Sequence, residues 1–227
     1  MVIRSYVHGG FYGLITGGLF LGKERPLKEL IVGEYALRQG IPTNTILAAL
    51  CRRVVGPFYR SWLITREIPE APDLIGFLEN LKVKSLHQRA TIKRRLIGNV
   101  ATAIRRMHDR GIYHADLHLK NILVGVNSEG EFSVYLIDFD KSRFLDRFTF
   151  RFRMKNLMRL NRSAEKMKRL GLPITTRDQM RFLREYFREE PENFKKAKKR
   201  LKPFLLLQEI HRFGWRFLPL PTRPTSR

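Results

Sequence analysis

The sequence predicts an α+β fold with two lobes, a small amino-terminal lobe of strands with one helix and a larger, mainly helical lobe. Three observations lead to this prediction. Short strand-like segments and glycines are concentrated in residues 1–66, a long segment with a single apolar face follows, and basic helix-like segments fill most of the remainder. We therefore divide the chain into the small lobe, residues 1–66, the helical lobe, residues 67–218, and a tail, residues 219–227.

The small lobe is expected to form strands with one helix. Its strand-like segments are residues 1–7, 46–50 and 62–65, of which the last two form a pair. Pro26 starts a helix-like run over residues 27–39, and Gly40 ends it, because glycine is favoured just after the last turn of a helix. Six glycines lie between residues 9 and 22, and residues 68–72, with two prolines, are expected to form a connector.

The helical lobe is expected to contain a long helix over residues 86–109. Apolar residues recur there at three- and four-residue steps, which gives one apolar face, and Gly111 ends the helix. Strands at 121–126 and 132–138 lie on either side of the turn sequence Asn-Ser-Glu-Gly, so they are expected to form a hairpin. Residues 147–207 favour basic helices.

The chain is strongly basic, but its composition is otherwise that of a globular protein. Hydrophobic residues make up 43%, and Lys and Arg total 44 against 21 Asp and Glu, a formal net charge of +23. Residues 141–227 carry 25 basic and 8 acidic residues, so 25 − 8 = +17 of that charge lies there. Such an imbalance indicates a polyanionic neighbour, which is nucleic acid, an anionic membrane or a phosphorylated substrate.

The cysteine count and the hydropathy argue against a fold held by disulfides or zinc and against a membrane-spanning segment. A single cysteine, Cys51, cannot form an internal disulfide, and no cluster of Cys and His has the spacing of a zinc site. A reducing compartment is therefore expected. No segment reaches the roughly 20 apolar residues that cross a membrane.

Two polar clusters lie at the mouth of the predicted hairpin. His114, Asp116 and Asn121 come before its first strand, and Asp138 and Asp140 come at the end of its second. Phosphoryl transfer needs a carboxylate that orients the attacking hydroxyl and oxygen ligands that hold Mg²⁺ on the phosphates. The short loop lets Asp116 face the acceptor while Asn121 faces the metal, and Asp138 adds a carboxylate of the kind that Mg²⁺ prefers.

The clusters resemble the protein-kinase-like superfamily, whose catalytic loop reads H-x-D-x-x-x-x-N and whose metal loop begins with aspartate. The order of elements is also similar: long helix, Gly111, catalytic loop, hairpin and metal loop. Three features differ from the signalling kinases. Asp140 replaces a glycine, His118 replaces a lysine, and no A-P-E segment follows. In these features the chain looks like the small-molecule and lipid-linked kinases.

Over most of its length the chain is similar to the lipopolysaccharide kinase family, whose members phosphorylate the Kdo sugar (3-deoxy-D-manno-octulosonic acid) on lipid A or a core heptose. The matching segments are residues 4–10, 25–29, 40–42, 63–71, 114–123, 137–140 and 155–162. The resemblance implies a protein-kinase-like two-lobed fold with a truncated small β lobe, because the glycine-rich phosphate loop and two strands expected before Arg4 are absent. The glycines at 9–13 lack the spacing of that loop and favour a turn.

The resemblance also implies roles for the residues of the two clusters. Asp116 would be the catalytic base or would orient the acceptor hydroxyl. Asn121 and Asp138 would hold Mg²⁺. Asp140 would either hold a second metal or support its loop, and His114 would brace the catalytic loop.

Three further residues would serve the nucleotide phosphates. Arg4 stands where a strand lysine is usual, and arginine keeps the charge with a different, forked geometry. Glu29 corresponds to the helix glutamate that steadies this cation, the alternative being an ordinary exposed charge. For His118, contact with phosphate and simple replacement of the lysine are equally supported.

The basic residues after the metal loop are expected to dock the acceptor or an anionic membrane surface. Residues 147–154 interleave cations with aromatic residues, and residues 155–170 continue as a cationic helix. The docking candidates are Arg147, Arg151, Arg153, Lys155, Arg159 and Arg162. Cations interleaved with aromatics also fit RNA, but phosphotransfer gives no reason for RNA, and no nucleic acid is expected.

The resemblance therefore implies an enzyme that uses ATP and Mg²⁺ to phosphorylate a Kdo hydroxyl of a lipopolysaccharide precursor. Its expected place is cytoplasmic, peripheral on the inner face of the bacterial inner membrane. Two alternatives stay open. One is a kinase of another acceptor, such as core heptose, a small molecule or a protein. The other is a catalytically impaired pseudokinase that binds anionic lipid, which the missing phosphate loop favours.

Overall fold

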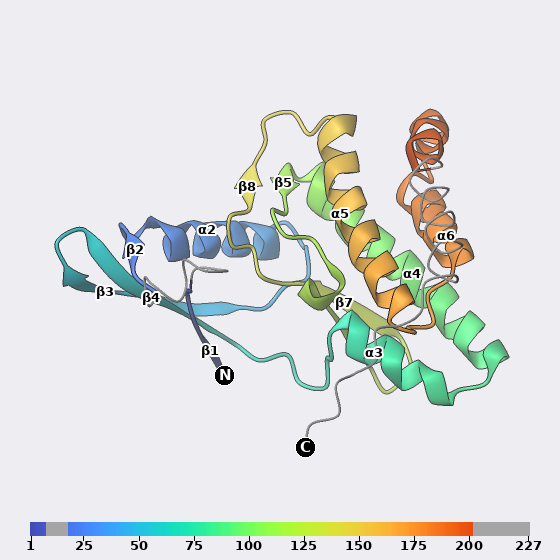
Figure 1. The fold of residues 1–227 in the computed structure, drawn as a ribbon, viewed down its shortest axis with the longest axis horizontal. Coiled ribbons are helices and arrows are strands. Elements are labelled where there is room, and N and C mark those ends of the chain that lie inside the picture. Colours follow the sequence, from blue (N-terminus) through green and yellow to red (C-terminus); the bar gives the residue numbers. More distant parts are fainter. Residues whose placement is uncertain (8–17, 202–227) are drawn as a thin grey trace, which may run out of the picture. The chain divides into compact units, whose positions relative to one another are not determined.

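The computed structural model describes residues 1–7 and 18–201, and the chain divides into two units, Met1–Tyr186 and Phe187–Arg227 (Figure 1). The first unit contains the predicted small lobe and residues 67–186 of the predicted helical lobe. In the second unit, residues 191–201 are helical, and Lys195 pairs with Glu192 at 2.9 Å. The expected turn at residues 9–13 and the tail at 219–227 lie outside the described residues.

The sheet of the small lobe is built around one long strand. β4 (Phe58–Thr65) runs antiparallel to β3 (Ile46–Val55), and it also pairs with β1 (Val2–Ser5) and β2 (Phe20–Leu21). The predicted pair of strands is confirmed, and both strands are longer than expected. The strand predicted at residues 1–7 is confirmed over its central part.

One helix lies against this sheet (Figure 1). α2 (Glu24–Arg38) confirms the predicted helix and starts three residues earlier than expected, and Gly40 follows it with a φ of +69°, which glycine adopts without strain. Gly33 lets the helix approach β3 closely, because an added Cβ would lie 2.7 Å from Ile46 Cδ1. The core under this sheet is small and consists of Tyr6, Phe20 and Leu63.

The helical lobe begins with α3 (Leu74–Asn80), the short 3-10 helix η1 (Leu81–Val83) and α4 (Leu86–Asp109). α4 has the predicted bounds. A capping box starts it, in which Ser85 and Gln88 each bond the other's backbone N–H, and its buried face includes Leu96, Val100 and Met107. α3 was not predicted, because its seven residues are too short to show a clear period.

Short strands follow α4 and carry the loops of interest. β5 (Ile112–Tyr113) pairs with β8 (Arg143–Phe144), and β6 (Ile122–Val126) pairs with β7 (Phe132–Leu136) in the predicted hairpin. A 3-10 turn, η2 (Leu119–Asn121), leads into β6.

Two basic helices complete the unit, as predicted: α5 (Phe150–Arg169) and α6 (Thr176–Tyr186). α6 packs on α4, and Lys93 of α4 reaches Asp178 of α6 at 2.5 Å. Among the described residues, no helix is long and apolar enough to cross a membrane. The division between residues 66 and 67 stays a prediction.

Candidate functional site

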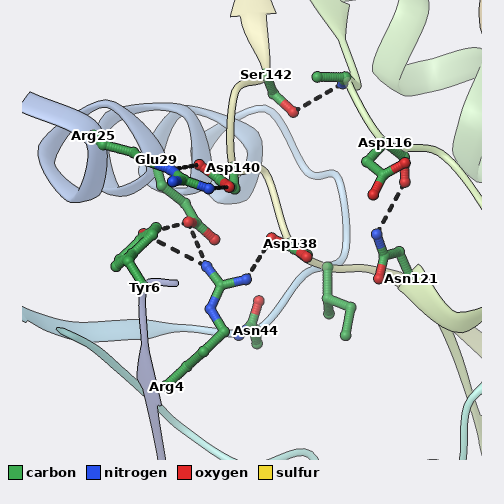
Figure 2. A network of polar contacts seen from close by, with 12 residues as sticks. Arg4, Tyr6, Arg25, Glu29, Asn44, Asp116, Asn121, Asp138, Asp140 and Ser142 are labelled. Atoms are coloured by element: carbon green, nitrogen blue, oxygen red, sulfur yellow. Dashed lines mark hydrogen bonds and ion pairs between the residues drawn. The ribbon is translucent and has the colours of Figure 1, made fainter. Parts of the chain in front are cut away.

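The predicted catalytic loop connects β5 with β6 and carries Asp116. The Asn121 Nδ2 group donates a hydrogen bond to the Asp116 carbonyl at 2.9 Å, which closes the loop on itself (Figure 2). The Asn121 side chain is buried, and because its nitrogen serves the loop, its Oδ1 atom is the one available as a ligand. The Asp116 carboxylate stays half exposed, with a side-chain exposure of 52%.

His114 links the catalytic loop to the metal loop. Its Nδ1 atom accepts a hydrogen bond from the Asp116 N–H at 3.2 Å, so its Nε2–H donates to the Ile137 carbonyl at 3.1 Å. The His114 ring is fully buried and packs against the ring of Phe139, with 5.2 Å between the ring centroids. Burial lowers the pKa of His114 to about 4, so the ring is neutral near pH 7 and cannot act there as a charged group.

A second layer holds the loop through Asn156 of α5, which was not predicted from the sequence. Its Nδ2 group donates to the His114 carbonyl at 2.8 Å, and its Oδ1 atom accepts from the His114 N–H at 3.2 Å. The same Oδ1 lies 3.0 Å from His108 Nε2, whose other ring nitrogen lies 2.6 Å from the Tyr186 hydroxyl. Burial lowers the pKa of His108 to about 3. We call His108, His114, Asn156 and Tyr186 the neutral network.

Asp138 begins the metal loop in a left-handed conformation, with a φ of +64°. This region is uncommon for residues other than glycine, and aspartate is one of the few that tolerate it. Arg4 Nη1 lies 2.5 Å from Asp138 Oδ1, although 134 positions separate the two residues in the chain. The sharp backbone turn thus directs Asp138 back toward the small lobe.

Arg4 stands between two carboxylates (Figure 2). Its Nη2 atom lies 2.5 Å from Glu29 Oε2, and the Tyr6 hydroxyl also bonds that oxygen. Burial lowers the pKa of Arg4, but the charges of Glu29 and Asp138 raise it further than burial lowers it, so the guanidinium stays charged. Burial also raises the pKa of Glu29, against the pull of Arg4.

A second ion pair joins the same two parts of the chain. Arg25 of α2 contacts both carboxylate oxygens of Asp140, with Nε lying 2.7 Å from Oδ1. The guanidinium of Arg25 also stacks over the rings of Tyr6 and Phe20, at 5.1 and 4.7 Å. Asp140, assigned to a second metal or to loop support, therefore has its charge partner within the protein. We call Arg4, Arg25, Glu29, Asp138 and Asp140 the charged network.

No role was predicted for Arg25 from the sequence, although it lies in one of the segments that match the family. The signal was nonetheless in the sequence. Arg25 lies four residues before Glu29, on the same face of α2, and Asp140 is an acid in a place where glycine is usual. A carboxylate at a position where glycine is usual needs a cationic side chain as its partner.

A cavity of about 270 Å³ lies beside the charged network. Its lining is mixed. The polar and charged residues are Arg4, Glu29, Asn44, Thr65, Arg66, Glu67 and Asp138. The apolar residues come from the sheet, the connector and the hairpin and are Val2, Leu63, Ile68, Ala71, Leu123 and Ile137. A pocket with apolar walls and charged groups beside them suits a flat ring system attached to phosphates.

Two basic side chains lie at the Asp116 carboxylate. Arg159 Nη1 of α5 lies 2.9 Å from Oδ1, and His118 Nε2 lies 3.5 Å from Oδ2. His118 therefore lies beside the candidate base. Arg159, predicted as a docking residue, contacts the catalytic loop itself.

The other docking candidates separate into two groups. Arg147, Arg151, Lys155 and Arg162 are exposed. Arg153 instead pairs with Asp109 of α4 at 3.0 Å, and its side chain is only 15% exposed. Its burial corrects the expectation of a surface cation, because Asp109 turns it inward.

The oxygen atoms of this site fit a Mg²⁺ ion together with phosphates. Asn121 Oδ1 and the Asp138 carboxylate provide an amide and a carboxylate ligand, and Mg²⁺ usually takes one or two carboxylates and completes its shell with phosphate and water. Within residues 1–7 and 18–201, no group of three or more His, Cys, Asp or Glu could hold a metal ion.

Comparison with known proteins identifies the family. The lipopolysaccharide kinase (Kdo/WaaP) family matches residues 16–186. The 3-deoxy-D-manno-octulosonic acid kinase of Actinobacillus succinogenes is 30% identical over 191 residues, covering 81% of this chain and 74% of that protein. The kinase of the same name from Vibrio cholerae is 29% identical over 72% of this chain and 65% of its own length, and that of Photobacterium damsela subsp. piscicida is 28% identical over 72% and 63%.

The matched segment thus spans slightly less than two thirds of the Vibrio and Photobacterium proteins. A solved structure of WaaP in complex with acyl carrier protein matches 85% of this chain and 76% of its own, with 25% identity and a TM-score of 0.61. These matches confirm the predicted α+β, protein-kinase-like fold class. The family match covers most of the chain, including the catalytic loop, the metal loop and α5, and we conclude that the chain belongs to the lipopolysaccharide kinase (Kdo/WaaP) family.

Proposed function

We propose that this protein is a sugar kinase that transfers the terminal phosphate of ATP to a hydroxyl of the Kdo sugar on a lipid A precursor. The observation that carries the proposal is the position of Arg4, which reaches the metal-loop residue Asp138 beside a cavity with a mixed lining. The names of the relatives support Kdo as the acceptor.

Arg4 is the cation proposed to bind the nucleotide phosphates. Its two partners differ in exposure, because the Glu29 side chain is only 4% exposed and that of Asp138 is 31% exposed. Glu29 is thus the partner that Arg4 keeps, and it holds the Arg4 guanidinium beside the cavity. The Asp138 side of the guanidinium is the one that can exchange its contact for a phosphate oxygen.

Asp116 is the residue proposed to take the proton of the acceptor. The acceptor oxygen forms a bond to the terminal phosphorus, the bond from that phosphorus to the bridging oxygen breaks, and the hydroxyl proton passes to the Asp116 carboxylate. Arg159 and His118 orient this carboxylate from either side. Mg²⁺, held by Asn121 and Asp138, would supply charge neutralisation for the phosphates.

The acceptor and the cell membrane are proposed to meet the protein at α5. The exposed cations Arg147, just before α5, and Arg151, Lys155 and Arg162 of α5 suit a lipid that carries phosphates and an acidic sugar. We place the protein on the cytoplasmic face of the inner membrane for this reason. WaaP is known in complex with acyl carrier protein, so co-elution with that protein is a direct further assay.

The decisive experiment is phosphorylation of Kdo–lipid A with labelled ATP and Mg²⁺ by the wild type and by Asp116→Asn. Loss of a positioned base costs about 100- to 10,000-fold in rate, so the variant should be at least about 100-fold slower. Arg94→Gln, which removes an exposed cation of α4 outside the proposed acceptor surface, serves as a folded control and should stay within about threefold of the wild type. Full activity of Asp116→Asn would remove Asp116 from the mechanism.

Two results would favour the alternatives. Labelling of core heptose or a small molecule, but not of Kdo–lipid A, would make the protein a kinase of another acceptor. A pseudokinase would bind anionic vesicles but show no shift of its melting temperature with ATP and Mg²⁺.

A further inference from the structure

The turn between β3 and β4 carries a set of apolar side chains that the small lobe does not bury. Val54 is 44% exposed, Val55 is 64% exposed and Phe58 is 39% exposed, and Leu21 of β2, which pairs with Phe58, is 78% exposed. The core of the lobe lies elsewhere, around Tyr6, Phe20 and Leu63. These four residues, which we call the hairpin tip, therefore present an apolar surface to the outside.

The hairpin that carries most of the tip has charge of one sign. No aspartate or glutamate lies between Glu34 and Glu67, whereas the hairpin contains Arg52, Arg53 and Arg60. All three arginines are exposed. Near Leu21 of β2, the exposed Lys23 is followed by the exposed Glu24, which pairs with Lys28. Charged residues that only keep a surface soluble usually have both signs, so a hairpin that has only cations around its apolar tip indicates an anionic partner.

The hairpin tip is held in a defined shape. Gly56 turns the chain with a φ of +50°, and its carbonyl accepts a hydrogen bond from Arg53 Nε at 2.7 Å. The Gly22 N–H donates to the Pro57 carbonyl at 3.0 Å, which ties β2 to the turn. The apolar side chains are therefore presented together, at the end of the sheet away from the β6–β7 hairpin (Figure 1).

We propose that the hairpin tip inserts into the surface of an anionic phospholipid bilayer. Apolar side chains at a tip enter the boundary between headgroups and acyl chains, and the surrounding arginines bind the lipid phosphates. A purely apolar tip would also suit another protein, and a purely basic one nucleic acid, but only a bilayer has an apolar layer beneath an anionic one. The inference rests on the proposed function for its purpose, because a lipid-linked acceptor lies in such a membrane.

The experiment measures vesicle binding without nucleotide or acceptor, so its outcome is independent of kinase activity. Wild type is sedimented with phosphatidylglycerol vesicles and with phosphatidylcholine vesicles. Arg52→Gln/Arg53→Gln should bind the anionic vesicles about 30-fold more weakly, from the usual contribution of two cations near such a surface. Val55→Asp should weaken binding about tenfold or more, because it places a charge at the depth of the acyl chains. Arg94→Gln/Arg106→Gln, two exposed cations of α4, removes the same charge and should bind as wild type does.

A gain-of-signal variant tests insertion directly. After subtraction of the wild-type signal, the tryptophan fluorescence of Val55→Trp should shift to the blue when phosphatidylglycerol vesicles are added. Lipids brominated on their acyl chains should quench this fluorescence. An unchanged emission of bound protein would overturn the proposal. So would vesicle binding that is lost only in Arg147→Gln/Arg151→Gln, at the residues around the start of α5, or tip variants that change the oligomeric mass and not vesicle binding. Thermal melts of each variant show whether it is folded.

Discussion

The charged network and the neutral network hold opposite sides of the same site in different ways. The charged network joins the small lobe to the metal loop through ion pairs whose side chains are between 4% and 36% exposed. The neutral network fixes the catalytic loop with uncharged hydrogen bonds among fully buried groups, of which His108, His114 and Asn156 have negligible exposure.

The roles proposed for the two networks, phosphate binding for the charged one and support of the catalytic loop for the neutral one, explain this difference. Groups that bind phosphate must exchange partners, and an ion pair at the edge of a cleft can be replaced by another ion pair at little cost. A catalytic loop must instead keep one geometry. Buried neutral hydrogen bonds achieve this, because a donor or acceptor left without a partner costs the full desolvation penalty.

The largest expected effect comes from breaking the neutral network at Asn156. Asn156→Leu leaves the His114 N–H, the His114 carbonyl and a His108 ring nitrogen without their partner. At about 1–3 kcal/mol for each buried group, and with partial relaxation, the free energy of unfolding should fall by about 4 kcal/mol. Urea denaturation measures the loss.

Arg151→Leu is the matched control for that variant. It lies on the same helix but is exposed, so it should change the free energy of unfolding by no more than about 0.5 kcal/mol. If Asn156→Leu costs as little as this control, the loop is held by something other than the neutral network.

The contributions of the two networks to the free energy of unfolding change in opposite directions as the pH falls. The pKa of His114 is lowered to about 4 and that of His108 to about 3, whereas both titrate near 6.5 when unfolded. Their neutral burial is fully stabilising above pH 6.5 and is lost as the pH falls, by about 2 kcal/mol for the pair between about pH 7 and about pH 5.5. Burial raises the pKa of Glu29, so its contribution has the opposite sign: it is complete below the ordinary pKa of a glutamate and is lost as the pH rises through the raised pKa.

Urea denaturation at a series of pH values measures this slope. His108→Gln should remove about half of the acid loss above pH 5.5, because one of the two titrations is gone. A free energy of unfolding that stays flat across this range would show that both rings take up their protons in the folded protein as they do in the unfolded chain.

The smallest expected effect is the coupling of Arg25 to Asp140. Alanine at either position, and at both, forms a double-mutant cycle whose interaction energy should be about 1 kcal/mol, since the pair is bidentate but partly exposed. The pair of Lys28 and Glu24 on the same helix is over 70% exposed and should give about 0.3 kcal/mol. Equal coupling in the two cycles would make Arg25–Asp140 an ordinary surface pair.

The local features of this protein could be predicted from its sequence. The apolar period of residues 86–109, the turn before β7 and the glycine after α2 each act over a few residues, so the helix and the hairpin were placed correctly. The short elements α3, β5 and β8 were missed because too few residues carry the pattern.

The sequence by itself determined the candidate residues for the chemistry, because Asp116, Asn121 and Asp138 lie in two short motifs. Only the tertiary structure decided what holds them. Arg4 meets Asp138 across 134 positions, Arg25 meets Asp140 across 115, and Asn156 meets His114 across 42. Local periodicity says nothing about such pairs. They form because packing brings α2 and α5 to the loops, where a buried polar or charged group needs a partner.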